Sequence, residues 1–62
     1  MEGKHVSIRI LMLLQDEKLS LSDLMSRLHV TKHSAERAVQ RLKARKLIQF
    51  NQIDNVYELV KN

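Results

Sequence analysis

The residues of this chain that are best suited to binding chemistry are the basic ones between Thr31 and Lys46. This window holds six Lys or Arg residues and one acidic residue, Glu36, so its net charge is +5, against +4 for the whole chain of 62 residues. Positive charge concentrated on one segment is typical of a protein that binds a polyanion. A solvated helix face rich in Lys and Arg has the same composition. The positions of these residues in the fold must therefore distinguish a polyanion-binding surface from an ordinary solvated face.

The residue types that enzymes and metal sites need are absent or wrongly spaced. The chain has no Cys and only one Gly, which excludes a thiolate ligand, a disulfide and a glycine-rich phosphate loop. The three histidines, His5, His29 and His33, lack the spacing of metal ligands. No nucleophile lies near a base, and the chain is too short for a deep cleft. We therefore expect no enzymatic activity, no metal, no cofactor and no small-molecule ligand.

Hydrophobic periodicity predicts two helices before the basic segment. The first is expected at about 5–15, because apolar residues recur there at helical spacing. They are Val6, Ile10, Leu13 and Leu14. Ser20 and Asp23 have the spacing of a capping box, which satisfies free N–H groups at a helix start. They predict a short second helix at about 21–28.

A longer helix and a hairpin complete the predicted fold. Thr31 is a favourable N-cap for a third helix at about 32–46, whose apolar positions recur at i, i+4 and i+7. These positions are Ala35, Val39 and Leu42. The apolar period then changes to two, and two β-rich runs flank the turn residues Asp54 and Asn55, which predicts a hairpin at about 47–60. The expected fold is mainly α with a C-terminal β-hairpin, an α+β class.

Length and hydropathy predict one cytoplasmic domain. Sixty-two residues are near the lower size at which a chain folds around its own core, so we expect a single domain over residues 1–62. No apolar stretch approaches the roughly 18 residues that span a bilayer. The longest apolar run also lacks the cleavage site of a signal peptide. We therefore expect no membrane contact.

The segment from Leu19 to Ile48 resembles the winged helix-turn-helix domain of small bacterial, phage and plasmid transcriptional regulators. The matching residues are Ser20, Asp23-Leu24, Leu28-His29-Val30-Thr31, Leu42 and Leu47-Ile48. The resemblance implies three helices plus a β wing, with the third helix reading double-stranded DNA. One position departs from the pattern, since Lys46 stands where the family usually has a Gly at the end of this helix. A Lys can adopt the left-handed conformation required there at a cost of about 1 kcal/mol.

The third helix carries side chains that suit contacts with DNA. The major groove is about 12 Å wide and admits one helix, whose N-terminal residues reach the base edges. The candidates for base contacts are the early exposed residues Lys32, His33, Ser34, Glu36, Arg37 and Gln40. The candidates for phosphate contacts are Thr31, Ser34, Arg41, Lys43, Arg45 and Lys46, with Arg27 on the second helix. Some of these residues also have structural interpretations, because Thr31 caps the helix and Glu36 has the spacing to pair with Lys32 or Gln40.

The hairpin is expected to support the fold and not to read DNA. Its tip, Gln52–Val56, contains Asp54 and no Lys or Arg, whereas wings that enter the minor groove usually carry a basic residue. We expect Phe50 and Leu59 to be buried against the core.

Ile8 and Met12 lie away from the apolar stripe of the first helix, which suggests a contact surface. A twofold dimer through this surface would place two recognition helices about one DNA turn apart. A larger regulator protein is the other candidate partner.

Two functions other than DNA binding are also open. One is a protein–protein module, such as an adaptor or a phage-type inhibitor, that does not bind DNA. The other is a binder of structured RNA.

Overall fold

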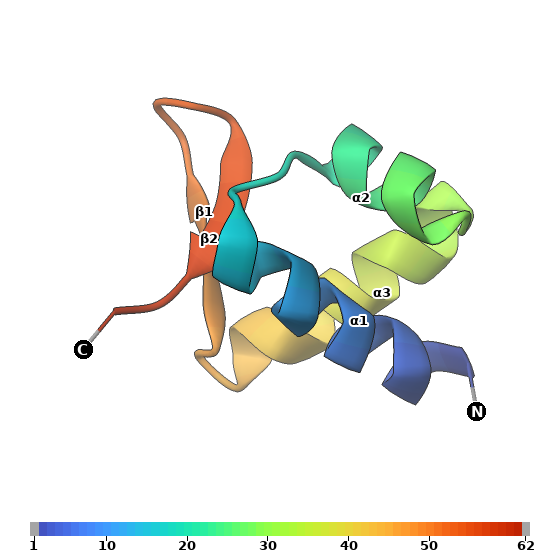
Figure 1. Cartoon of the computed structure of the whole chain (residues 1–62). Coiled ribbons are helices and arrows are strands. Elements are labelled where there is room, and N and C mark those ends of the chain that lie inside the picture. The colour runs from blue at the N-terminus through green and yellow to red at the C-terminus, as the bar shows by residue number, and fades with distance from the viewer. Residues whose placement is uncertain (1, 62) are drawn as a thin grey trace.

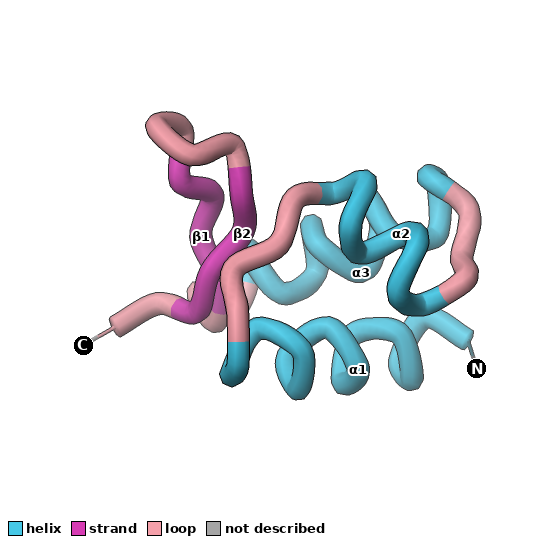
Figure 2. Tube along the Cα trace, turned by 45° about the horizontal axis from the view of Figure 1, so that its top comes forward, coloured by secondary structure: helices cyan, strands magenta, loops and turns pink. Residues whose placement is uncertain are grey.

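The computed structural model describes the backbone of residues 2–61 and the side chains of residues 5–61. Three helices precede a two-stranded antiparallel hairpin: α1 (Glu2–Asp16), α2 (Leu21–Leu28), α3 (Lys32–Ala44), β1 (Ile48–Asn51) and β2 (Val56–Leu59). The helices pack together, and the hairpin stands at the end of the molecule away from the N-terminus (Figures 1 and 2). The predicted winged-helix fold class is confirmed. Helix α1 begins earlier than predicted, because the apolar stripe starting at Val6 marks only the packed part of the helix.

The core lies where the three helices meet the base of the hairpin. Its buried residues are Val6, Ile10, Leu14, Leu19, Leu24, Leu28, Ala38, Val39, Leu42 and Ile48. Ile10 and Leu24 are completely inaccessible. Helices as short as α2 are marginal in isolation, so the burial of these apolar side chains is what stabilises them.

Side-chain caps fix the helix-turn-helix unit formed by α2 and α3. Ser20 Oγ accepts a hydrogen bond from the Asp23 N–H at 3.2 Å, and Asp23 Oδ2 accepts one from the Ser20 N–H at 3.2 Å, which is the predicted capping box. His29 ends α2 in the left-handed conformation, with φ of 57°. Thr31 Oγ1 then accepts from the Ser34 N–H at 3.2 Å and begins α3. His29 and Thr31 thus define the turn that joins α2 to α3.

Helix α3 ends two residues before its predicted end. Lys46 has φ of 61°, the left-handed conformation that a Gly adopts without strain. The Lys46 N–H donates to the Lys43 carbonyl at 2.9 Å, and the Leu47 N–H donates to the Leu42 carbonyl at 3.0 Å. This bond pattern is a Schellman motif. The helix therefore stops at Ala44 because the chain reverses here, which brings β1 back alongside the core.

The hairpin is attached to the helices by the segment that precedes α2. Strands β1 and β2 pair with Ile48 opposite Leu59 and Phe50 opposite Tyr57. On the other edge of β2, the Leu19 N–H donates to the Tyr57 carbonyl at 3.2 Å and the Tyr57 N–H donates to the Leu19 carbonyl at 2.7 Å. This β-bridge joins the wing to the start of the helix-turn-helix unit.

The prediction that Phe50 is buried is wrong. Its side chain is 39% exposed and packs against the Tyr57 ring, with 5.0 Å between ring centroids. Ile48 is the buried residue of β1. Phe50, two residues further along the strand, therefore lies beyond the core and packs on the partner strand. Leu59 is half-buried and packs against the core.

Candidate nucleic-acid interface

Helix α3 divides into an apolar face and a polar face. Ala35, Ala38, Val39 and Leu42 are buried against the rest of the domain. Every predicted DNA-contacting residue on or beside α3 is exposed except Ser34, which is half-buried. The exposed ones are Thr31, Lys32, His33, Glu36, Arg37, Gln40, Arg41, Lys43 and Arg45. The structure therefore brings these side chains together on one surface.

The polar face of α3 has a centre, formed by His33, Arg37 and Gln40. A helix turns 3.6 residues per turn, so these three side chains lie opposite the buried Ala35 and Leu42. The centre points directly away from the core. These side chains reach furthest from the protein and would be the first to contact any surface against which the helix docks.

Two basic edges flank this centre. Arg41 and Arg45 lie one turn apart on the edge that faces α1, where both line a groove between the two helices. Lys32 and Lys43 lie three turns apart along the opposite edge, as helical periodicity requires. The interface is thus a polar central stripe between two rows of positive charge.

A surface hollow of about 710 Å³ lies where α3 approaches the hairpin. It is lined by Leu21 from α2, by Tyr57 from β2 and by six residues of α3, which are His33, Glu36, Arg37, Val39, Gln40 and Arg41. Residues of the central stripe therefore line one side of a concave surface, and α2 and the wing contribute to its other sides.

The basic side chains of α3 are not neutralised by acidic neighbours. Two ion pairs occur among the side chains of residues 5–61, and neither includes a residue of α3. One joins Arg27 to Glu17, with distances of 2.7 and 3.3 Å, and the hydrogen bond and charge of Glu17 raise the pKa of Arg27. Arg27 is thus engaged by Glu17. Glu36, whose spacing would allow a pair with Lys32 or Gln40, takes part in neither ion pair.

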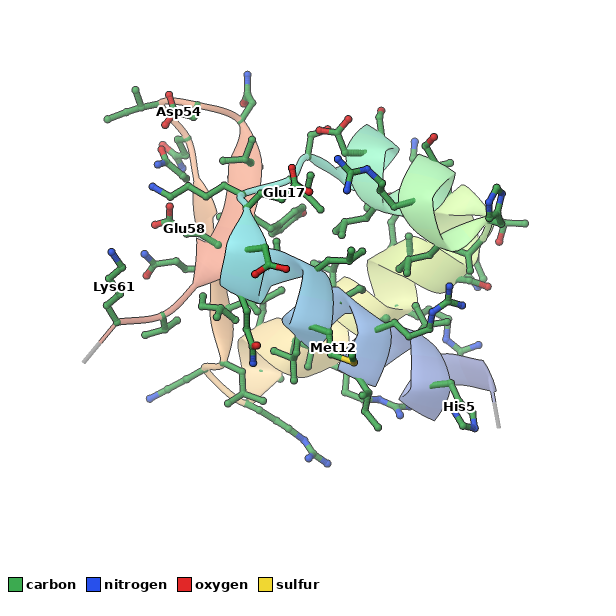
Figure 3. The ribbon with its side chains drawn as sticks, viewed as in Figure 1. His5, Met12, Glu17, Asp54, Glu58 and Lys61 are labelled. Carbon is green, nitrogen blue, oxygen red and sulfur yellow. The ribbon has the colours of Figure 1, made fainter. Side chains whose placement is uncertain are left out.

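The hairpin presents acidic groups. Glu58 accepts hydrogen bonds from Gln49 Nε2 at 2.6 Å and from Asn51 Nδ2 at 3.4 Å, and it pairs with Lys18 at 3.4 Å. The bond from Gln49 is the largest cause that lowers the pKa of Glu58; burial opposes it, and Asn51 and Lys18 add to the lowering. Asp54 lies at the hairpin tip (Figure 3). The wing therefore adds no positive charge to the interface.

The remaining sequence predictions concern the contact surface at Ile8 and Met12, metal binding and the membrane. Ile8 and Met12 are 50% and 62% exposed, and Met12 lies on the outer side of α1 (Figure 3). Within residues 5–61 there is no group of three side chains that could hold a metal ion. No helix of the described chain is long and apolar enough to cross a membrane.

Two contacts that build the interface have no clear signal in the sequence. The bridge between Leu19 and Tyr57 involves one residue before α2, too short a stretch to show the alternation of a strand. The pair of Glu17 and Arg27 joins residues from the loop and from the end of α2. Both depend on the tertiary arrangement, although Leu19 was recognisable as a buried position by its spacing from Leu24.

Comparison with protein families gives a match over most of the chain. The model of the MarR family matches residues 4–53, which include α2, the turn, α3 and β1. No curated protein and no solved structure gave a significant match. This family consists of winged helix-turn-helix DNA-binding regulators of transcription and not of enzymes. The match and the observed fold agree, and the chain belongs to the MarR family.

Proposed function

We propose that this protein binds double-stranded DNA in a sequence-specific manner, with α3 lying in the major groove, and that it regulates transcription. The observation that carries the proposal is the polar central stripe of α3 between its two basic edges. A helix in the major groove has base edges beneath it and a phosphate backbone on either side. The distribution of side chains around α3 matches this environment.

The central stripe supplies the base contacts in this proposal. Arg37 suits the O6 and N7 acceptors of guanine, and Gln40 suits the N6 and N7 atoms of adenine. His33 lies one turn before Arg37, near the start of the helix, where recognition helices approach bases most closely. Glu36 borders the stripe and suits the N4 donor of cytosine.

The edges supply the phosphate contacts. We assign Arg41 and Arg45 to one backbone, and Lys32 and Lys43 to the other. Thr31 retains its hydroxyl proton as a donor after capping the helix. If about four to six phosphates are neutralised, the plot of log affinity against log salt concentration has a slope near −4 to −5. A slope near zero contradicts the proposal.

The wing positions α3 in this account and makes no basic contact of its own. The hairpin tip has Asp54 but no Lys or Arg, and a carboxylate is repelled by a phosphate backbone. The bridge from Leu19 to Tyr57 holds the wing against the segment that begins α2. The wing therefore stabilises the helix-turn-helix unit from one side.

The test is a titration of random and selected duplexes at several salt concentrations. We expect Arg37→Ala to relax the sequence preference, because it removes a base contact, and Arg41→Ala to weaken all sequences alike, because it removes a phosphate contact. Lys61→Ala is the matched control, since Lys61 is an exposed cation that follows β2 and lies away from α3 (Figure 3), and it should retain the affinity and preference of the wild type. Unchanged binding by both Arg37→Ala and Arg41→Ala would defeat the assignment.

Competition between duplex DNA and duplex RNA at matched salt separates this function from RNA binding. The major groove of A-form RNA is deep and narrow and does not admit a helix. We therefore expect duplex DNA to displace duplex RNA. Equal competition by the two duplexes indicates general attraction to polyanions and contradicts major-groove reading.

A further inference from the structure

We propose that the groove between α1 and the C-terminal half of α3 docks a helical segment of a partner protein, one whose apolar stripe is flanked by acidic residues. The groove has a volume of about 430 Å³. It is lined by the apolar residues Ile8, Leu11, Leu42 and Leu47, by Ser7, and by Arg41 and Arg45. It lies between α1 and α3 and shares Arg41 with the hollow beside the wing.

The apolar part of this site is a cluster and not a single exposed side chain. Ile8 is 50% exposed and Leu47 is 41% exposed. Met12 is 62% exposed and lies four residues, about one helical turn, after Ile8 in α1. Single apolar residues on a surface are ordinary, but neighbouring ones beside a concavity are typical of interaction sites. Such a stripe along a helix fits the apolar side chains of a second helix at positions i, i+3 or i+4, and i+7.

Charge decides which kind of partner fits. Arg41 and Arg45 line the groove, and none of its lining residues within 5–61 is acidic. Among the acidic side chains of that range, Glu17 lies in the loop after α1 and Asp54 and Glu58 lie on the hairpin (Figure 3). An occupant with carboxylates beside its apolar stripe can form bidentate hydrogen bonds with both arginines.

A second copy of the chain does not meet this requirement. A twofold interface pairs the same patch on both subunits, so it would bring Arg41 and Arg45 of each copy towards a surface that is itself basic. Like charges brought together at an interface are unfavourable. A phosphate backbone alone fits no better, because it offers nothing apolar to cover Ile8 and Leu47. An acidic amphipathic helix satisfies both parts of the groove.

Docking in this groove competes with DNA binding. Arg41 and Arg45 form one basic edge of α3, so a carboxylate-bearing partner occupies the groups assigned to one DNA backbone. This consequence rests on the proposed function, whereas the docking itself does not. The docking is therefore tested in the absence of DNA, and its result is separable from that of the DNA titration.

The probe is a displayed library of 14-residue helical peptides. The apolar stripe is constant, and the flanking positions vary among Glu, Gln and Lys. We expect selection on the wild-type chain to enrich Glu at the flanks at least about fivefold, the result of charge complementarity with Arg41 and Arg45. A purified Glu-rich peptide should then shift backbone NMR signals of residues 7–12 and 41–47. Enrichment of Lys, or no charge preference, overturns the proposal.

Two variants and one matched control locate the site. Ile8→Asn should weaken the Glu-rich peptide at least about tenfold, since it removes an apolar lining residue. Arg45→Gln should reduce the preference for Glu over Gln, since only Arg41 then remains to pair with the carboxylates. Ile53→Asn is the control, because Ile53 is 93% exposed at the hairpin tip and should leave binding unchanged. All three positions are exposed, so the fold should survive, as an unchanged thermal transition verifies. Equal weakening by Ile53→Asn, or a stable dimer of the free chain that Ile8→Asn dissociates, contradicts the proposal.

Discussion

Lys46 occupies a backbone conformation that favours Gly, and this gives a sharp test of how α3 ends. Its φ is 61°, and an L-residue in the left-handed region is strained by about 1–2 kcal/mol. Gly escapes that strain but loses about 0.5–1 kcal/mol more than Ala in conformational entropy on folding. Taken between the midpoints of these ranges, the difference predicts that Lys46→Gly is more stable than Lys46→Ala by about 0.75 kcal/mol. Both variants lose the same charge, so the comparison isolates the backbone.

The same pair of substitutions at Lys43 supplies the control. Lys43 is an exposed residue inside α3, where Gly is less stable than Ala by about 1 kcal/mol. The order of the two variants should therefore reverse between the two positions. Thermal unfolding is a suitable assay, because about 1 kcal/mol shifts the melting temperature of so small a domain by roughly 4–8 °C. If Ala is at least as stable as Gly at Lys46, the left-handed helix end is refuted.

Three further predictions concern stability. Ile10 is completely buried, so Ile10→Ala should lower the free energy of unfolding by about 2–5 kcal/mol and leave little folded protein by circular dichroism. Ile53→Ala at the exposed hairpin tip should change that free energy by less than about 0.5 kcal/mol, and equal losses by the two variants would contradict the observed core. Thr31→Ala should lower the free energy of unfolding in urea by about 1 kcal/mol, because it removes the cap of α3, and an unchanged midpoint would contradict the cap. The lowered pKa of Glu58 means that its contribution is present above the ordinary pKa of a Glu, near about 4.3, and is lost as the pH falls through its folded-state pKa. Between neutral and acidic pH the wild type should therefore lose more melting temperature than Glu58→Gln, and identical profiles would oppose the hydrogen bond from Gln49.

Local signals in the sequence were enough to predict much of the helix-turn-helix unit. Ser20 and Thr31 are caps whose partners lie three residues away, so their bonds depend on the local chain alone. The left-handed helix end at Lys46 was predicted through the resemblance, because the winged-helix pattern usually has a Gly at that position. These features need no knowledge of the packed domain.

Features that depend on tertiary contacts were harder to predict. Phe50 follows the alternation of β1, but the pattern does not show that the core ends beside Ile48. The bridge between Leu19 and Tyr57 joins residues far apart in the sequence, as does the pair of Glu17 and Arg27.

The candidate interface was partly predictable, because helical periodicity is a local signal whereas the packing of the helices is not. Periodicity assigned the polar residues of α3 to its exposed face, as the structure shows. It did not show that the edge carrying Arg41 and Arg45 faces α1 across a groove, since that depends on how the two helices pack. The sequence therefore predicted the α3 face and the contact surface at Ile8 and Met12 separately, without showing that Arg41 and Arg45 line the same groove as Ile8.

The most direct test of the central proposal is an NMR map of the chain as a selected DNA duplex is added. The account predicts that the largest shifts follow the exposed face of α3, at His33, Arg37 and Gln40 and then along both basic edges. It also predicts that the outer face of α1 at Met12 and the hairpin tip at Ile53 shift little. Shifts concentrated on α1 or on the hairpin tip, with the face of α3 unchanged, would contradict the proposal that this helix reads DNA.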